Sequence, residues 1–341
     1  MIMSRSFWIS LLLLAAALVL SVAVGSVFIP PADILRLVGA RLGLAAAPGP
    51  ELQTFDTILF SLRLPHAFLI ALAGAALSGS GAAYQGLFRN PLADPYLIGV
   101  ASGAGLGAVA AMGVQWPYTP LGLLAVPLAA FAGGLLAVLI VYQLARVGRT
   151  IPTTNLILAG VAFSAFASAL TSFLMINASG ELRRALIWLL GGSTMSGWQP
   201  VLGALPYIGI GLGVLLTMGH ALNVLQFGDD QAHQLGLPVR RVRWLVILSA
   251  TLASAAAVAF AGVIGFVGLI VPHILRMLCG PDHRRLLPLS MLGGASMLLL
   301  ADILARVLMA PQELPVGIIT ALIGAPFFLW VLRRAKRQAF W

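Results

Sequence analysis

Charged side chains are scarce in this sequence of 341 residues: only 9% are Asp, Glu, Lys or Arg, whereas 60% are hydrophobic. A soluble domain carries about 25% charged residues, so this composition excludes an ordinary soluble protein and predicts a membrane protein. Basic residues outnumber acidic ones by 20 to 10, but they are scattered between apolar runs. That scatter favours membrane-topology signals over nucleic-acid binding.

Cysteine and lysine are almost absent. Cys279 is the single cysteine, so cysteine spacing indicates neither a disulfide nor a metal site. The only lysine, Lys336, follows an alanine, and the Gly-Lys pair of a Walker-type phosphate loop is therefore missing. H-E-x-x-H and G-x-S-x-G patterns are missing too, which leaves zinc proteolysis and serine-hydrolase chemistry without support. We therefore predict that the chain is not an enzyme and does not hydrolyse ATP by the Walker route.

Uncharged apolar stretches, by contrast, are abundant, and a helix needs about 20 such residues to cross a bilayer. Basic clusters at 240–243 and 276–285 flank the apolar stretch 244–275. Because short basic loops stay on the cytoplasmic side, that stretch must cross outward and return, so it holds two short spans. The predicted spans are 6–32, 64–88, two within 95–145, 150–180, 185–228, two within 244–275, 286–309 and 314–332.

These spans predict an all-α polytopic membrane protein, a single transmembrane domain over residues 1–341 with about ten transmembrane helices. Arg5 precedes the first span and the basic cluster 333–337 follows the last, so both ends are predicted to be cytoplasmic. A nine-span alternative would place one arginine cluster outside. Another alternative treats the first span as a signal peptide, but its apolar run exceeds the roughly 7–15 residues of a signal-peptide core.

Small residues recur at four-residue spacing in three spans, which predicts close helix packing in lipid. They are Gly99, Gly103 and Gly107 in one span, Gly74, Ser78 and Ala82 in another, and Gly209 and Gly213 in a third. The stretch AGVIGFVGLIVP, 261–272, combines three glycines with a proline and predicts an irregular helix. Asp302 is the one clear carboxylate within an apolar run, and Arg306, one helical turn on, predicts a local ion pair.

Five motifs carry a family resemblance: SGAAYQGLFRNPLADPYLIGVASGAG, GFVGLIVPHILR, DHRRLLPLS, LADILAR and ELPVGIITALIGAPFFLWVL. Together, from Arg63 to Leu332, they resemble the permease subunits of bacterial binding-protein-dependent ABC importers for vitamin B12, iron siderophores and haem. The resemblance implies a type II ABC importer permease fold with ten helices per protomer. It also implies a homodimer or pseudo-dimer with the pathway at its interface, two ATP-binding cassette subunits that hold ATP-Mg, and a periplasmic or surface substrate-binding protein.

The loop 223–243 is the longest polar segment on the predicted cytoplasmic side. Asp229 and Asp230 suit the first turn of a helix, where the helix dipole is positive, and Gly236 followed by Pro238 ends it. A solvated connector is the plain interpretation, whereas the resemblance implies a coupling helix that sits in a cleft of the ATPase subunit. The residues assigned to that contact are Gly228, Asp229, Ala232, Gly236 and Leu237, of which the small ones would let the helix seat.

On the opposite face, RLPH at 63–66 matches a family motif that reads R-x-P-R. The resemblance implies that Arg63 and Arg306 form salt bridges with glutamates of the substrate-binding protein. His66 replaces the second arginine of the motif, and a neutral histidine would weaken one bridge at about pH 7, which puts the local docking geometry or its pH dependence in question. Interfacial anchoring is the alternative role for the two arginines.

Two short polar segments match the cytoplasmic gate of that family. Asn90 and Leu92 lie in RNPLADP, and Thr153 and Thr154 lie at the start of the fifth span. Uncharged hydroxyl and amide groups close a pore without holding a large chelate tightly. Helix capping is the alternative role for Thr153.

The predicted function is the transmembrane permease subunit of an importer in the bacterial cytoplasmic membrane. It would move a metal chelate (iron siderophore, haem or cobalamin) into the cytoplasm, powered by a separate ATPase subunit and binding no cofactor itself. His273 and His283 belong to family motifs, and structural roles are favoured over haem or metal binding. A stand-alone ion-coupled transporter or channel is the alternative, which the dearth of intramembrane carboxylates disfavours. An intramembrane enzyme is a third class, for which we find no catalytic constellation.

Overall fold

The computed structural model describes residues 5–25, 27–44, 49–114, 116–117, 119–148, 152–177, 182–193 and 195–338. Within those residues every regular element is a helix, which confirms the predicted all-α class. In the part of the chain that the structure describes, seven helices are long and apolar enough to cross a membrane: α1 (Arg5–Ala23), α4 (Leu64–Leu87), α6 (Pro120–Ala145), α7 (Thr153–Asn177), α9 (Gln199–Thr217), α12 (Val239–Ala261) and α14 (His283–Val307). Three further apolar helices are α5 (Val100–Met112), α13 (Val267–Cys279) and α15 (Val316–Gln338).

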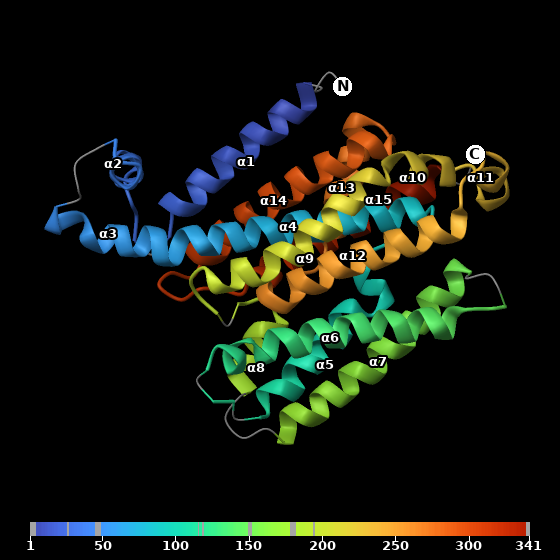
Figure 1. Ribbon diagram of the computed structural model, residues 1–341, viewed down its shortest axis with the longest axis horizontal. Coiled ribbons are helices and arrows are strands. Elements are labelled where there is room, and N and C mark those ends of the chain that lie inside the picture. The colour runs from blue at the N-terminus through green and yellow to red at the C-terminus, as the bar shows by residue number, and fades with distance from the viewer. Residues whose placement is uncertain are drawn as a thin grey trace.

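Together these helices occupy the ten predicted span regions. The remaining elements are short: α2 (Pro31–Arg41), η1 (Pro50–Leu52), α3 (Gln53–Thr57), η2 (Ile58–Arg63), η3 (Pro95–Ile98), α8 (Leu182–Leu189), α10 (Gly219–Leu225) and α11 (Asp229–Gln234). In Figure 1, α5 to α8 form a layer along one side of the bundle, below the other helices. The protein therefore consists of long crossing helices joined by short helices at the ends of the bundle.

We name the two ends of the bundle after residues that flank α4, which runs from the Arg63 end to the Arg89 end. Figure 1 shows α2 and α3 at the Arg63 end, on the left, and α10 and α11 at the Arg89 end, on the right. α14 runs antiparallel to α4. Asp302 lies 2.8 Å from His66 near the Arg63 end, and His283, the first residue of α14, lies against Gly86 near the Arg89 end.

α12 and α13 form the outward-and-return pair predicted within 244–275. The Tyr84 hydroxyl, late in α4, donates to the carbonyl of Ile247, early in α12, so α12 begins at the Arg89 end. Arg276, near the end of α13, donates to Gln85 Oε1 at 2.8 Å, so α13 ends there as well. The two arginine clusters that flank this stretch therefore lie at the same end of the bundle, as the charge pattern requires.

The connection between α12 and α13 is an irregular stretch, as its glycines and proline predict. Gly262 (φ 81°) and Phe266 (φ 70°) bound it with left-handed backbone. The Tyr96 hydroxyl donates to the carbonyl of Ile264 at 2.8 Å and accepts from its N–H at 3.0 Å, so backbone groups freed by the break are paired. α13 has 13 residues, about 20 Å of helix, which is less than a bilayer core of roughly 30 Å.

Glycine contacts explain how closely some of these helices approach. A Cβ on Gly74 would overlap the carbonyl of Gly294, and one on Gly103 would overlap that of Gly133, so α4–α14 and α5–α6 pack backbone against backbone. These contacts confirm the packing role of two of the three predicted small-residue rows. For the third row the prediction of close packing within the chain is wrong, because no heavy atom lies within 4 Å of the position where a Cβ on Gly209 would be.

Candidate functional sites at the two ends of the bundle

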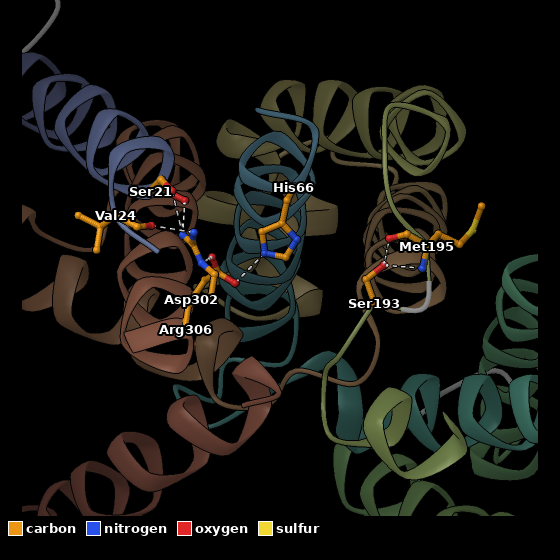
Figure 2. A network of polar contacts seen from close by, with 7 residues as sticks. All are labelled: Ser21, Val24, His66, Ser193, Met195, Asp302 and Arg306. Atoms are coloured by element: carbon orange, nitrogen blue, oxygen red, sulfur yellow. Dashed lines mark hydrogen bonds and ion pairs between the residues drawn. The ribbon is translucent and has the colours of Figure 1, made fainter. Parts of the chain in front are cut away.

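A cavity of about 530 Å³ opens at the Arg63 end, between the start of α4, the end of α14 and the segments that follow α8 and precede α15. Figure 2 looks into this region. Its polar lining comes from Arg63, His66, Ser193, Ser196, Asp302, Arg306 and Glu313. The three residues predicted to dock a binding protein therefore lie together around one opening.

Two guanidinium groups at this cavity point toward the end of α1. Arg306 donates from Nη1 to the carbonyl of Val24 at 2.9 Å and from Nη2 to the carbonyl and hydroxyl of Ser21 at 3.0 and 2.9 Å (Figure 2). Arg63 donates from Nη1 to the last two carbonyls of α1, at 2.8 and 3.0 Å. Carbonyls in the last turn of a helix lack helical partners and carry the negative end of the dipole. The two arginines therefore cap α1 and join it to α4 and α14.

Asp302 lies between two cationic or potentially cationic side chains. Its Oδ2 accepts from Arg306 Nε at 3.0 Å, which confirms the predicted ion pair, and its Oδ1 lies 2.8 Å from His66 Nε2. A buried carboxylate is tolerated when its oxygens are bonded in this way. The His66 ring retains about a third of its exposure (36%) and faces the cavity, whereas Arg63 and Arg306 are 9% and 7% exposed. Of the three predicted docking residues, His66 is thus the one presented to solvent.

At the other end, RNPLADP begins as the cap of α4. The N–H of Asn90 donates to the carbonyl of Gln85 at 3.1 Å and that of Arg89 to Gly86 at 3.4 Å, the pattern of a Schellman motif. Arg89 occupies the left-handed position (φ 50°) that glycine usually takes. Asn90 Oδ1 then accepts from the N–H of Leu92 at 2.9 Å, which closes the turn. The side chain of Asn90 therefore shapes the turn that holds half-buried Leu92.

Asp94 ends the polar part of this segment and begins the next helix. Its Oδ1 accepts from the N–H of Tyr96 at 2.8 Å and caps η3, with Pro95 at the first helical position. Burial raises the pKa of Asp94 to about 6, against the hydrogen bond from Tyr96, which acts to lower it. Asp94 is therefore a carboxyl group that titrates near physiological pH beside the predicted gate.

The turn packs against the start of α7, which brings the two predicted gate segments together. A hollow of about 10 Å³ is lined by Asn90 and Asp94 of the turn and by Leu156 of α7. Thr154 is exposed close by, one residue after α7 begins. The side chain of Thr153 lies outside the described residues.

α11 is the helix predicted within 223–243. Gly228 (φ 104°) precedes it and Gly236 (φ 82°) follows it, both in conformations that glycine adopts without strain. Asp229 Oδ2 accepts from Arg243 Nη2 at 2.7 Å and links α11 to α12. A short helix with one polar tie to the bundle is thus held at the surface of the Arg89 end.

The residues of this segment differ in exposure. Ala232 is fully buried in its own chain, and Leu237 is half-buried with its N–H bonded to the carbonyl of Ala232 at 3.0 Å. Phe227 and Leu235, by contrast, are 66% and 68% exposed. Of the predicted coupling residues, Ala232 positions the helix from inside, whereas the outer surface of the segment consists of exposed residues such as Leu235 and Gly236.

α10 and the residue that caps its end carry two amide side chains that the sequence patterns did not single out. Asn223 Nδ2 donates to Asp282 Oδ1 at 2.6 Å, and Gln226 Nε2 donates to the carbonyl of Gly86 at 2.8 Å. Burial acts to raise the pKa of Asp282, but hydrogen bonds from Asn223 and from the N–H of Arg284, with nearby arginine charges, outweigh it and hold the pKa below its usual value. The only signal in the sequence was a pair of amides at the end of an apolar run, which is also typical of a solvated loop.

The FecCD transport family model matches residues 12–334, nearly the whole length of this helical bundle and every candidate residue described above. The chain belongs to the FecCD transport family. Among curated relatives of this family member, a cobalamin import system permease of Halobacterium salinarum is 48% identical over 84% of this chain and 76% of the relative. A hemin transport system permease of Yersinia pestis is 43% identical over 89% and 93%.

A vitamin B12 import system permease of Citrobacter koseri is 39% identical over 97% of this FecCD chain and 95% of the relative. Among solved structures, an inward-facing conformation of a metal-chelate type ABC transporter is similar in three dimensions, with 31% identity and a TM-score of 0.80. The match covers 96% of this chain and 98% of the solved one. The FecCD chain therefore has the fold of an ABC transporter permease, as its motifs predict.

Proposed function

We propose that this FecCD family member is the transmembrane permease subunit of an ABC importer that carries a metal chelate of the cobalamin, haem or iron-siderophore class into the cytoplasm. A separate subunit binds and hydrolyses ATP-Mg, while this chain supplies the pathway and binds no cofactor. The observation that carries the proposal is the family match over 12–334. Relatives named for cobalamin and hemin import that align over most of the chain support the cargo class.

The complex would contain two copies of this chain, two ATP-binding cassette subunits and a substrate-binding protein. The Arg89 end would face the cytoplasm, because arginines concentrate there and short basic loops are retained on that side. They include Arg89, Arg240, Arg241, Arg243, Arg284 and Arg285. With that orientation α11 would meet the ATPase, and the RNPLADP turn with the start of α7 would form the cytoplasmic gate.

The Arg63 end would then receive the binding protein through Arg63, His66 and Arg306. Burial of the two arginines adds a condition to this docking. A glutamate of the partner must either accept from guanidinium N–H groups that do not bond α1 or displace the α1 carbonyls from the others. The exposed ring of His66 would make the first contact, so capture of the partner would be stronger when that ring is protonated.

The importer is tested by purifying this chain with and without its candidate ATPase and reconstituting both in vesicles. The chain alone is expected to hydrolyse no ATP, whereas the complex hydrolyses ATP and takes up cyanocobalamin or hemin presented on the binding protein. A variant of the ATPase without its Walker lysine is the control, and it should abolish uptake. Uptake that follows an ion gradient in the absence of ATP would overturn the importer and favour a secondary transporter.

The coupling role of α11 is tested by Gly236→Trp, with Gly43→Trp as the matched control. Both glycines have positive φ (82° and 72°) and open space where a side chain would begin, so the backbone strain is similar, about 1 kcal/mol. They lie at opposite ends of the bundle. Gly236→Trp is expected to reduce co-purification of the ATPase at least about tenfold while Gly43→Trp does not. Equal assembly of both variants would contradict the coupling role.

A further inference from the structure

Three helices meet at the Arg89 end in a cluster that we call the α10 junction: Gly86 of α4, Asn223 and Gln226 of α10 and its extension, and Asp282 and His283 at the start of α14. Asn223 bonds α14 through both the nitrogen and the oxygen of its side-chain amide. Its Nδ2 donates to Asp282 Oδ1 at 2.6 Å, and its Oδ1 accepts from the N–H of His283 at 2.8 Å. Because Asp282 is also the N-cap of α14, α10 is attached directly to the first turn of that helix.

Gln226 attaches α10 to α4. Its Nε2 donates to the carbonyl of Gly86 at 2.8 Å, which lies in the last turn of α4, where carbonyls lack helical partners. The same Nε2 bonds the carbonyl of Leu222 at 3.0 Å, so its position is set by α10 itself. Gly86 also accepts the N–H of Arg89 in the cap that opens RNPLADP. One carbonyl therefore joins the α10 segment to the turn predicted as the gate.

His283 lies between the other two helices. Its Nδ1 is 2.9 Å from Asn223 Oδ1, and because that oxygen only accepts, the ring nitrogen is the donor. The opposite edge of the ring lies against Gly86, where an added Cβ would be 2.5 Å from Nε2. The ring is 2% exposed, so it fills the space between α10 and α4. A displacement of α10 toward or away from α4 therefore moves or unseats the histidine.

The chain that links this junction to α11 is very short. Only Phe227 and Gly228 separate Gln226 from Asp229, the first residue of α11. Two residues of backbone have limited slack, because each spans at most about 3.5 Å, so a displacement of α11 that exceeds this slack must also displace Gln226. A movement of α11 is thus passed to Gln226 rather than lost in a flexible linker.

We propose that Asn223 and Gln226 are positioning residues that transmit a movement of α11 to the end of α4 and so to the RNPLADP turn. The inference rests on the proposed function, in which α11 contacts the ATPase and the turn contributes to the gate. The neutral bond from Gln226 to the carbonyl of Gly86 suits such a joint, because it can be exchanged for water or a new partner at small net cost during the cycle. The joint acts in both directions, so holding the turn in one position also restrains α11.

The test follows the exposure of the turn in the assembled complex. In a Cys279→Ser background, Pro91→Cys places a single thiol in the exposed part of RNPLADP. Its rate of reaction with a maleimide is measured with and without ATP-Mg plus vanadate, for Gln226→Met, Asn223→Ala and the control His220→Ala, an exposed residue of the same helix. ATPase co-purification and ATP hydrolysis are measured on the same samples, because a merely structural defect would lower these as well.

In the unmutated and His220→Ala complexes the nucleotide is expected to change the labelling rate. In Gln226→Met the response should shrink about fivefold, the value of one lost hydrogen bond, with assembly and ATP hydrolysis preserved. Gln226→Lys, which retains a donor near the Gly86 carbonyl, should restore the response. If Asn223→Ala fails to assemble, the variant of the exposed residue Gln226 decides. An unchanged response in Gln226→Met overturns the junction alone, whereas no response in the unmutated complex overturns the proposed function and this inference with it.

Discussion

The polar clusters at the two ends of the bundle are built from different chemistry. At the Arg63 end, charged side chains of Arg63, Asp302 and Arg306 are buried and bonded within the chain. The α10 junction at the Arg89 end consists largely of amides and backbone groups. Breaking one side of a buried ion pair costs about 3–5 kcal/mol, whereas a neutral hydrogen bond is worth about 1 kcal/mol net.

This difference suits the two ends to different tasks. The charged cluster keeps the end of α1 in one place against α4 and α14, because no alternative partner compensates a buried guanidinium. The contacts of the α10 junction with α4 are uncharged and permit several arrangements of similar free energy, as the proposed role in a moving gate requires. Changes at the two ends should therefore affect stability unequally. Four substitutions, two of them in these clusters and two in the neighbouring RNPLADP turn, test this in order of the expected effect.

Arg306→Ala should produce the largest loss. It leaves Asp302 buried with His66 as its remaining partner and removes the caps on Ser21 and Val24, so we expect a loss of about 4 kcal/mol in unfolding free energy. Thermal unfolding in detergent measures it. Arg36→Ala at the same end is the control, because Arg36 is 72% exposed and lies 3.6 Å from Asp33, a pair worth less than about 1 kcal/mol. Similar shifts for both variants would contradict the anchoring role of Arg306.

Gly86→Ala should come next and probes the α10 junction by overpacking. The new methyl group would lie 2.5 Å from His283 Nε2, and relief of that clash should cost about 2 kcal/mol. Gly209→Ala is the matched control on α9, where the methyl group meets no atom within 4 Å and the change should be neutral or slightly stabilising. Thermal unfolding of both variants measures the difference. If Gly86→Ala left the unfolding free energy unchanged, the space between Gly86 and the His283 ring would be larger than the distances indicate.

Asp94→Asn should have a smaller effect, which depends on pH. Because burial raises the folded-state pKa of Asp94 to about 6, ionisation disfavours the folded state as pH rises past the ordinary carboxyl pKa, and the full penalty is present above the raised pKa. Asparagine cannot ionise but retains the oxygen that caps Tyr96. The unfolding free energy of the variant should exceed that of the parent by about 1.5 kcal/mol at about pH 8, after allowance for partial exposure, and match it at about pH 3, below the ordinary carboxyl pKa. A difference independent of pH would contradict the raised pKa.

Arg89→Gly should have the smallest effect, with the opposite sign to the first two substitutions. Arg89 adopts φ 50°, a left-handed conformation that costs a non-glycine residue about 1 kcal/mol. Glycine at this helix cap should raise stability by that amount. Arg241→Gly, which removes an exposed arginine from the first turn of α12, is the control and should lower stability slightly. If thermal unfolding showed Arg89→Gly to be less stable than the parent, the contacts of the arginine side chain would stabilise the fold by more than the strained backbone costs.

Much of the fold was predictable from local patterns. Alternating apolar runs and arginine clusters predicted the ten helical regions, and the glycines of 261–272 predicted the break between α12 and α13. The pair Asp302–Arg306 and the helix α11 followed from spacing within one helical turn and from capping residues. Each of these signals is local in sequence, so no knowledge of the packed structure is needed to recognise it.

The contacts that determine what the site residues do are not local. Arg63 bonds carbonyls 40 and 41 positions away, His66 meets Asp302 across 236 positions, and Gln226 reaches Gly86 across 140. The family resemblance predicted which residues belong to each site but not these partners. The two arginines predicted to dock a partner instead bond the end of α1, and Ala232, predicted as a coupling contact, is buried within its own chain.

Composition and charge placement by themselves determined that this protein crosses a membrane, about how often, and that it lacks the Walker lysine of an ATPase, because transfer into lipid is a sum over residues. Which buried donor meets which acceptor was decided only by the tertiary structure. A guanidinium or amide taken out of water must bond whatever carbonyl or carboxylate the packed helices place within about 3 Å. At the Arg63 end that acceptor is the end of α1, and at the Arg89 end it is the last turn of α4.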